Sequence, residues 1–205
     1  MDIIIYLGVL PMSNPAFIVD GQMEKKIIQS LCPSSPVRIL NRNGKDVSYD
    51  VAGKYASSLI RLLKHNYPII IVFDRENRSD PSATIATSLH DAIIGYGIQN
   101  VDILIGVPDR MIENWLLADI SSINMYYGLN PCICQINFEG TNGKSKLRSI
   151  IGNSTYSETQ DGPAMFSLCS VNNLYSNSSS FKSFCNIIKT INCTWLSEFN
   201  LKMPS

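Results

Sequence analysis

The chain has 205 residues, of which 45% are hydrophobic and 17% are charged, and its formal net charge at pH 7 is zero. This length and composition predict one folded domain, or one domain with a small appendage, that buries a sizeable core. A neutral chain lacks the overall positive field that draws a protein to nucleic acid, so any such contact needs a local basic patch or a basic partner.

The six cysteines are spread along the chain without the regular spacing of a disulfide framework. This distribution favours reduced thiols and a cytoplasmic location. The chain also lacks an apolar run of the ~20 residues that a membrane-spanning helix needs. Its amino-terminal apolar run, Ile3 to Leu10, follows an acid instead of a basic segment, which favours a strand over a signal peptide.

Strands and helices are predicted to alternate up to about residue 120. Short continuous apolar runs indicate strands, and apolar residues at three- and four-residue spacing indicate helices. This alternation predicts an α/β fold, with a mainly parallel sheet, helices on its faces and right-handed crossovers. The expected strands are Ile3 to Leu10, Ala16 to Val19, Val37 to Leu40, Ile69 to Phe73 and Val101 to Val107. The expected helices span 25–31, 47–65, 83–96 and 111–120.

The carboxyl-terminal part of the chain differs in composition. Residues 154–180 are rich in Ser, Asn, Tyr and Thr, whereas 144–151 and 181–191 keep a helical apolar spacing. We therefore expect an α/β core over residues 1–125 and a small, mainly helical extension over residues 126–205. Polar loops are expected to join its helices, with the serines before Phe181 forming a loop and a helix cap.

Five acids follow three of the predicted strands, at the point where each strand ends. Because the carboxyl ends of parallel strands lie at one edge of a sheet, we expect these carboxylates to converge there. Converging carboxylates repel one another unless a cation neutralises them, and Mg²⁺ prefers such oxygen ligands. The pattern predicts a Mg²⁺ or Mn²⁺ site, although each acid alone is also ordinary loop chemistry. The acids are Asp20 and Glu24 after the second strand, Asp74 and Glu76 after the fourth, and Glu113 in the helix after the fifth.

Three of these segments resemble the motifs of Toprim domains, in the order that the family has them. Phe17-Ile-Val-Asp-Gly-Gln-Met-Glu24 is similar to the first motif, in which Val-Glu-Gly ends a strand and a second acid follows. Ile71-Val-Phe-Asp-Arg-Glu76 is similar to the second motif, usually Asp-x-Asp. The Glu-Asn-Trp-Leu-Leu-Ala-Asp segment that ends at Asp119 resembles a branch of small bacterial Toprim-like proteins, which includes RloB-type proteins and relatives of the OLD nucleases.

The resemblance implies a Toprim-like, Rossmann-like fold and a metal-dependent nuclease that hydrolyses phosphodiester bonds in DNA or RNA. It implies that Asp74, Glu76 and Glu113 hold the metal. Asp20 is then the general acid or base, and Glu24 is a further ligand or orienting group beside it. Proteins of this branch often act in anti-phage defence with an ATPase, so the expected partners are nucleic acid and an ABC- or OLD-type ATPase.

Two positions depart from the family pattern by one methylene, in opposite directions. Asp20 stands where glutamate is usual, and Glu76 replaces the second aspartate of Asp-x-Asp. The two changes could compensate each other. They could equally mark a catalytically degenerate subunit or regulator that binds an ATPase partner without cleaving anything.

Three basic residues are candidates for phosphate contacts, since Lys and Arg supply most sequence-independent contacts to nucleic acid. Lys144 and Lys146 lie on a predicted helix, whose basic face could touch phosphate or could simply be solvated. Arg75 lies between two acids, where it could contact phosphate or pair with a neighbouring carboxylate.

Overall fold

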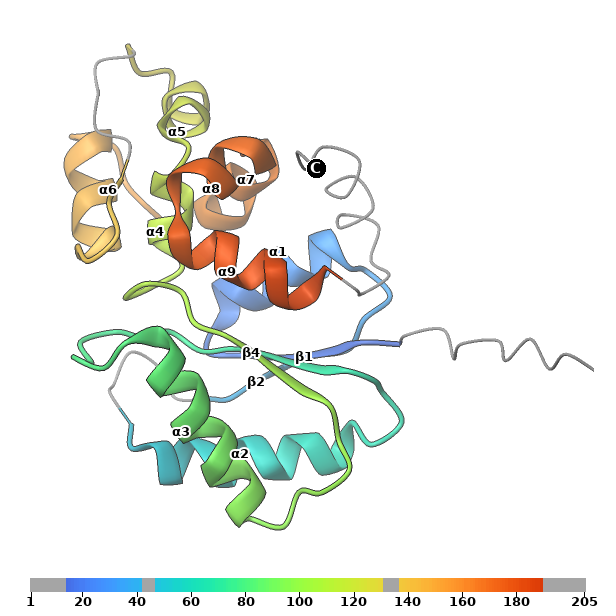
Figure 1. Ribbon diagram of the computed structural model, residues 1–205. Coiled ribbons are helices and arrows are strands. Elements are labelled where there is room, and N and C mark those ends of the chain that lie inside the picture. The colour runs from blue at the N-terminus through green and yellow to red at the C-terminus, as the bar shows by residue number, and fades with distance from the viewer. Residues whose placement is uncertain (1–13, 42–46, 131–136, 190–205) are drawn as a thin grey trace, which may run out of the picture.

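The computed structural model describes residues 14–41, 47–130 and 137–189 (Figure 1). Its described strands form one parallel sheet in the order β2-β1-β3-β4. The predicted α/β architecture, a parallel sheet flanked by helices, is thereby confirmed, and it is consistent with a Rossmann-like fold. The predicted strand from Ile3 to Leu10 lies outside the described residues. The strands are β1 (Ala16–Val19), β2 (Val37–Ile39), β3 (Ile69–Val72) and β4 (Ile103–Gly106).

Helices α1 (Gln22–Leu31), α2 (Tyr49–Leu62) and α3 (Ser82–Gly95) connect successive strands. In Figure 1, α2 and α3 lie together below the sheet, whereas α1 lies on the opposite face. The three predicted helices are therefore confirmed, with shifted ends. Helix α1 begins earlier than expected, so that Glu24 lies in its first turn.

The two central strands are buried along their whole length, because helices cover both faces of the sheet. Alternate side chains point to opposite faces, as the pleat of a strand requires. One set packs against α2 and α3, and the other packs against α1 and the helices that follow β4. The first set includes Ala16, Ile18, Ile69 and Ile71, and the second includes Phe17, Val19, Ile70 and Val72.

The helices that follow β4 share the hydrophobic core on the α1 side of the sheet. Trp115 anchors them: its indole N–H donates to Ser180 Oγ at 2.9 Å, and its ring packs against Phe181 and Phe184. The division of the chain near residue 125 stays a prediction. The helices are α4 (Glu113–Leu117), α5 (Ile120–Tyr127), α6 (Gly143–Ile151), α7 (Asp161–Leu168), α8 (Val171–Asn177) and α9 (Ser179–Ile188).

Two predictions for this part of the chain are wrong. The single helix expected over 111–120 is replaced by α4 and the start of α5. At the break, the buried Asp119 carboxylate accepts hydrogen bonds from Ser122 Oγ (2.8 Å) and Ser170 N–H (2.7 Å). Residues 154–180 contain α7 and α8 instead of only polar loops, because a few apolar side chains within this polar stretch reach the core.

The predicted cap before Phe181 is confirmed, since Ser178 Oγ accepts a hydrogen bond from the Phe181 N–H at 3.1 Å. The expectation of reduced thiols is wrong for Cys32, which is disulfide-bonded. Cys169 and Cys185 are free thiols. In the described part of the chain, no helix is both long and apolar enough to cross a membrane.

Candidate functional site

The candidate site lies where the strand order reverses. Strand β1 lies between β2 and β3, so the connections leaving β1 and β3 lead in opposite directions along the sheet. Open α/β sheets bind ligands in the crevice beyond the carboxyl ends of two such strands. Asp20 follows β1, and Asp74 lies just beyond β3. The Asp74 N–H donates to Asp20 Oδ2 at 2.8 Å, which joins the two strand ends at this point.

All five acids proposed from the strand ends line one pocket of about 280 Å³ at this edge, which we call the acid pocket. The structure thus brings together side chains that are more than ninety positions apart in the sequence, since Asp20 and Glu113 both belong to it. Lys144 of α6 and Glu158, in the loop before α7, complete the charged lining. Lys146 does not line the pocket and is exposed on α6.

Glu24 reaches the acid pocket because Gly21 leaves room for its carboxylate. A Cβ at Gly21 would lie 2.9 Å from Glu24 Oε2, closer than real Cβ atoms approach. The φ of Gly21 is −139°, an extended conformation that any residue adopts, so glycine matters here for space and not for backbone freedom: a larger residue would displace the flexible end of the Glu24 side chain. The result is a carboxylate in the first turn of α1, where the helix dipole favours negative charge.

Glu76 is held at the pocket by a link between the loops after β3 and β4. Its N–H donates to the Arg110 carbonyl at 2.6 Å, and both residues have left-handed backbones, with φ of 51° and 63°. Such a conformation costs roughly 1–3 kcal/mol for a residue other than glycine, and persists where the surroundings fix it. A second hydrogen bond, which Arg110 Nη2 donates to Asn77 Oδ1, joins the same two loops.

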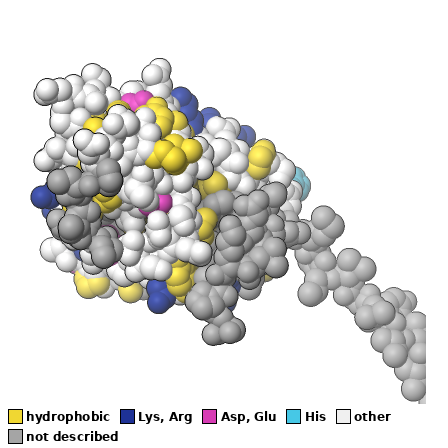
Figure 2. Space-filling view, turned by 90° about the horizontal axis from the view of Figure 1, so that it is seen from above, with side chains coloured by type: hydrophobic (Ala, Val, Ile, Leu, Met, Phe, Trp, Pro, Cys, Tyr) yellow, Lys and Arg dark blue, Asp and Glu magenta, His cyan; other side chains and the backbone are white. Residues whose placement is uncertain are grey.

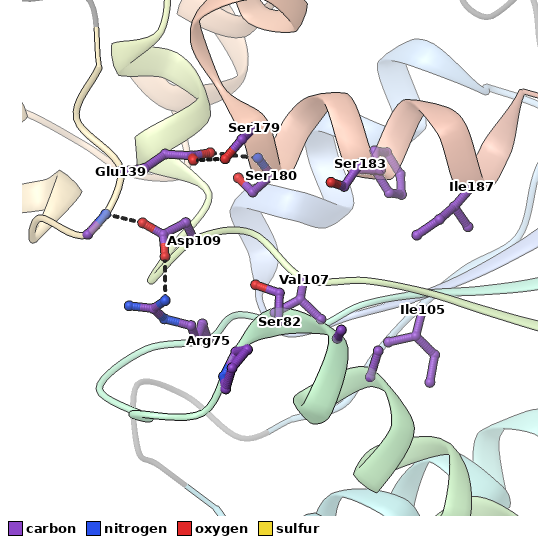
Figure 3. A pocket seen from close by; sticks show the side chains of 15 residues that line it. Arg75, Ser82, Ile105, Val107, Asp109, Glu139, Ser179, Ser180, Ser183 and Ile187 are labelled. Carbon is purple, nitrogen blue, oxygen red and sulfur yellow. Dashed lines mark hydrogen bonds and ion pairs between the residues drawn. The ribbon is translucent and has the colours of Figure 1, made fainter.

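Arg75 points away from the two acids that flank it in sequence. Its Nη1 lies 2.9 Å from Asp109 Oδ1, and its side chain lines a separate groove of about 580 Å³ between α3 and α9 (Figure 3). Of the two roles expected for Arg75, the structure therefore shows the pairing with a carboxylate. Asp109, which sequence reasoning did not single out, also accepts a hydrogen bond from the Gly140 N–H.

The carboxylates of the acid pocket are held in an unfavourable environment for negative charge. Burial raises the pKa of Asp20 to about 7; the hydrogen bond from Asp74 opposes this shift, and the charges of Glu24 and Glu76 add to it. Burial likewise raises the pKa of Glu113 to about 7, although the Lys144 ammonium acts in the opposite direction. Burial and the neighbouring carboxylates raise the pKa of Asp74 well above its ordinary range. Among the described residues, six carboxylates and one ammonium group line the pocket.

The donor chemistry of the pocket fits a hard divalent cation. Asp74 Oδ1 is buried and has no hydrogen-bond partner, so one carboxylate oxygen is left without a donor. Within the described residues, however, no group of three or more His, Cys, Asp or Glu side chains stands ready to hold a metal ion. Mg²⁺ takes only one or two carboxylates directly and keeps several waters, so it does not need a closed protein cage. The acids would draw together around the ion.

Sequence reasoning did not single out two residues that contact side chains of the acid pocket: Glu158, which lines it, and Tyr156, which lies beside it. Glu158 Oε2 accepts a hydrogen bond from Lys144 Nζ at 3.0 Å, and the Tyr156 hydroxyl donates to Glu113 Oε1 at 3.3 Å. Both come from the loop between α6 and α7. No local pattern places this loop over the pocket, because its position follows from helix packing: Gly162 of α7 lies so close to Met23 of α1 that a Cβ would meet it at 2.6 Å.

Comparisons of the chain with models of protein families, with characterised proteins and with solved structures find no match. The fold and the site themselves define the class. The chain is an α/β protein with a parallel sheet and a carboxylate-rich pocket at its topological switch point.

Proposed function

We propose that the chain is a metal-dependent nuclease with a Toprim-like site, which binds Mg²⁺ or Mn²⁺ in the acid pocket and hydrolyses phosphodiester bonds of DNA or RNA. The observation that carries this proposal is the convergence of five carboxylates, from three strand ends, in one pocket at the switch point of the sheet. Carboxylates that repel one another in a buried pocket need a cation, and the unpartnered Asp74 Oδ1 supplies a ligand atom for it.

The proposed roles follow from where each acid lies. Asp74, Glu76 and Glu113 would hold the ion, which when bound would polarise the phosphodiester and lower the pKa of a water. Asp20 would exchange the proton, because a group whose pKa lies near 7 is well suited to proton transfer at neutral pH. Glu24 would orient Asp20 or add a further ligand oxygen, since its charge acts directly on Asp20.

Capture of the nucleic acid would depend on a partner. The chain is neutral, and on the face seen in Figure 2 the described Lys and Arg side chains lie mostly toward the rim and form no continuous basic surface. Such a protein would hold a polyanion poorly by itself. The resemblance to RloB-type and OLD-related proteins supports an ABC- or OLD-type ATPase as that partner, in anti-phage defence.

Cleavage of labelled single- and double-stranded DNA and RNA in Mn²⁺ tests the proposal. Asp74→Asn removes the central ligand charge with little change of shape, and we expect it to lower the cleavage rate by roughly 100-fold or more. Asp91→Asn is the matched control, because Asp91 is an exposed acid on α3. Cleavage by the Asp74 variant at the rate of the unsubstituted protein would overturn the proposal.

A second candidate function is a non-cleaving subunit or regulator of an ATPase. It is favoured by the lack, among the described residues, of a ready-made group of three metal-binding side chains, and by the departures at Asp20 and Glu76. Calorimetric titration separates the two candidates. Mg²⁺ binding together with no turnover of any nucleic acid would support the regulator, whereas metal-dependent cleavage that Asp74→Asn abolishes would support the nuclease.

A further inference from the structure

Lys144 is the one basic side chain among the described residues that line the acid pocket. We propose that its ammonium group is the resident counter-ion of that pocket, and that a divalent cation must compete with it for the same carboxylates. The second half of this inference rests on the proposed function and concerns the regulation of the same site. The role of Lys144 as counter-ion concerns the metal-free protein and does not depend on the proposed function.

The position of Lys144 is fixed by the start of α6. The Asn142 side chain caps this helix by accepting a hydrogen bond from the Ser145 N–H at 2.9 Å. Gly143 lies against the first turn of α4, where a Cβ would come within 2.5 Å of Asn114 Oδ1 and 3.0 Å of Glu113 Cβ. Lys144 therefore enters the pocket directly beside Glu113, from a helix end that cannot shift away without losing this packing.

The charges around Lys144 come from the loop and from the acids of the pocket. Its Nζ lies 3.0 Å from Glu158 Oε2, and both side chains are partly exposed. Burial disfavours the ammonium form, but the carboxylates of Glu113, Glu158 and Asp74 outweigh it and raise the pKa of Lys144. In return, the ammonium acts against the effect of burial on Glu24 and Glu113. One cation is thus shared between acids on α1, α4 and the loop after β3.

Lys144 does not stabilise the helix to which it belongs. It lies in the first turn of α6, where the positive end of the helix dipole disfavours a cation, and this turn carries no acid. Lys146 lies on the same helix but is exposed and outside the pocket. The attraction that favours Lys144 therefore comes from the pocket and not from α6, which makes Lys146 a matched control.

Competition follows from the shared carboxylates. A divalent ion placed among Asp74, Glu76 and Glu113 would be repelled by an ammonium in the same pocket. At the effective dielectric constant of about 20 found near protein surfaces, such repulsion between close like charges is worth about tenfold or more in affinity. Removal of the lysine charge should therefore tighten metal binding.

The test is calorimetric titration with Mg²⁺ and Mn²⁺ of the full chain and of the variants Lys144→Met, Lys146→Met and Glu158→Gln. We expect the Lys144 variant to bind about tenfold more tightly than the unsubstituted chain, and the Lys146 variant to bind equally. Glu158→Gln leaves the ammonium in place and removes a pocket charge, so it should bind no more tightly. Unchanged or weaker binding by the Lys144 variant would overturn the competition.

Thermal melting in EDTA tests the counter-ion itself and separates its failure from that of the proposed function. If Lys144 is the counter-ion, its loss removes the ammonium charge that acts against the burial of Glu24 and Glu113, and the Lys144 variant should melt several degrees below the Lys146 variant. Equal melting temperatures would overturn the inference. Should none of the proteins bind Mg²⁺ or Mn²⁺, the proposed function fails, whereas the melting comparison still decides whether Lys144 is the counter-ion.

Discussion

The acid pocket and the groove between α3 and α9 differ in how their charges are matched. The groove is the larger cavity, but its charged side chains are paired: Arg75 with Asp109, and Glu139 with the amino-terminal turn of α9 (Figure 3). The acid pocket is about half as large, and its carboxylates repel one another. A paired charge holds structure together, whereas an unbalanced one costs stability and marks a place where a ligand is needed.

The two cavities meet at the segment Asp74-Arg75-Glu76. The first and last residues of the segment line the acid pocket, and the middle one lines the groove. Substitutions on the two sides should therefore change stability in opposite directions. Neutralising an acid of the pocket should stabilise the metal-free protein, and neutralising the partner of Arg75 should destabilise it.

The largest effect is expected for Glu113→Gln in the pocket. Glu113 is almost fully buried, and its pKa is raised from 4.5 to about 7. The folded state therefore holds a proton that the unfolded chain releases, and the stability of the protein falls as the pH rises from about 4.5 through 7. A shift of one pKa unit corresponds to 1.36 kcal/mol, so at pH 8 the neutral variant should be more stable than the unsubstituted protein by up to about 3 kcal/mol. Its advantage should vanish toward pH 4.

Urea denaturation of both proteins in EDTA, at pH 4.5, 6 and 8, measures this difference. Addition of Mg²⁺ at pH 8 should reverse its sign, because the bound ion would stabilise the ionised carboxylate that the variant lacks. A variant no more stable than the unsubstituted protein at pH 8 would show that Glu113 is already balanced within the folded chain.

A smaller effect of opposite sign is expected for Asp109→Asn in the groove. The carboxylate accepts from Arg75 and from the Gly140 N–H, and an amide has only one oxygen for these two donors. Because Asp109 is buried, the donor left unpaired should cost about 1–3 kcal/mol of unfolding free energy. Metal affinity should stay unchanged. If Asp109→Asn weakened metal binding as much as a substitution of a pocket acid does, the groove and the pocket would form one site.

The sequence allowed the sheet and the position of the acids to be predicted, because both depend on local patterns. Continuous apolar runs such as Ile69–Val72 indicate strands buried on both faces, and parallel strands bring their carboxyl ends to one edge. Asp20 and Asp74 therefore converge as expected. The direction of Arg75 could not be predicted, since it depends on the turn of the backbone before Glu76 and on the presence of Asp109.

The loop between α6 and α7 and the helices α7 and α8 could not be predicted from the sequence for a related reason. Helices α7 and α8 are short, with eight and seven residues, and each contributes few buried side chains, such as Met165 and Leu174. Their helical form depends on the core that they join, which no local spacing reveals. The loop between α6 and α7 brings Tyr156 and Glu158 beside the pocket only because α6 packs against α4, and α7 packs against α1 and α4.

Binding of Mn²⁺ to the unsubstituted chain, Asp74→Asn and Asp109→Asn, followed by calorimetry at pH 8, tests the central claim most directly. If the acid pocket is the metal site, the unsubstituted chain and the Asp109 variant should bind with the same affinity. The Asp74 variant should bind at least about tenfold more weakly, because even the substitution of a residue that only supports a metal ligand lowers the affinity by that factor. Equal Mn²⁺ affinity in the Asp74 variant and the unsubstituted chain would contradict the assignment of this pocket.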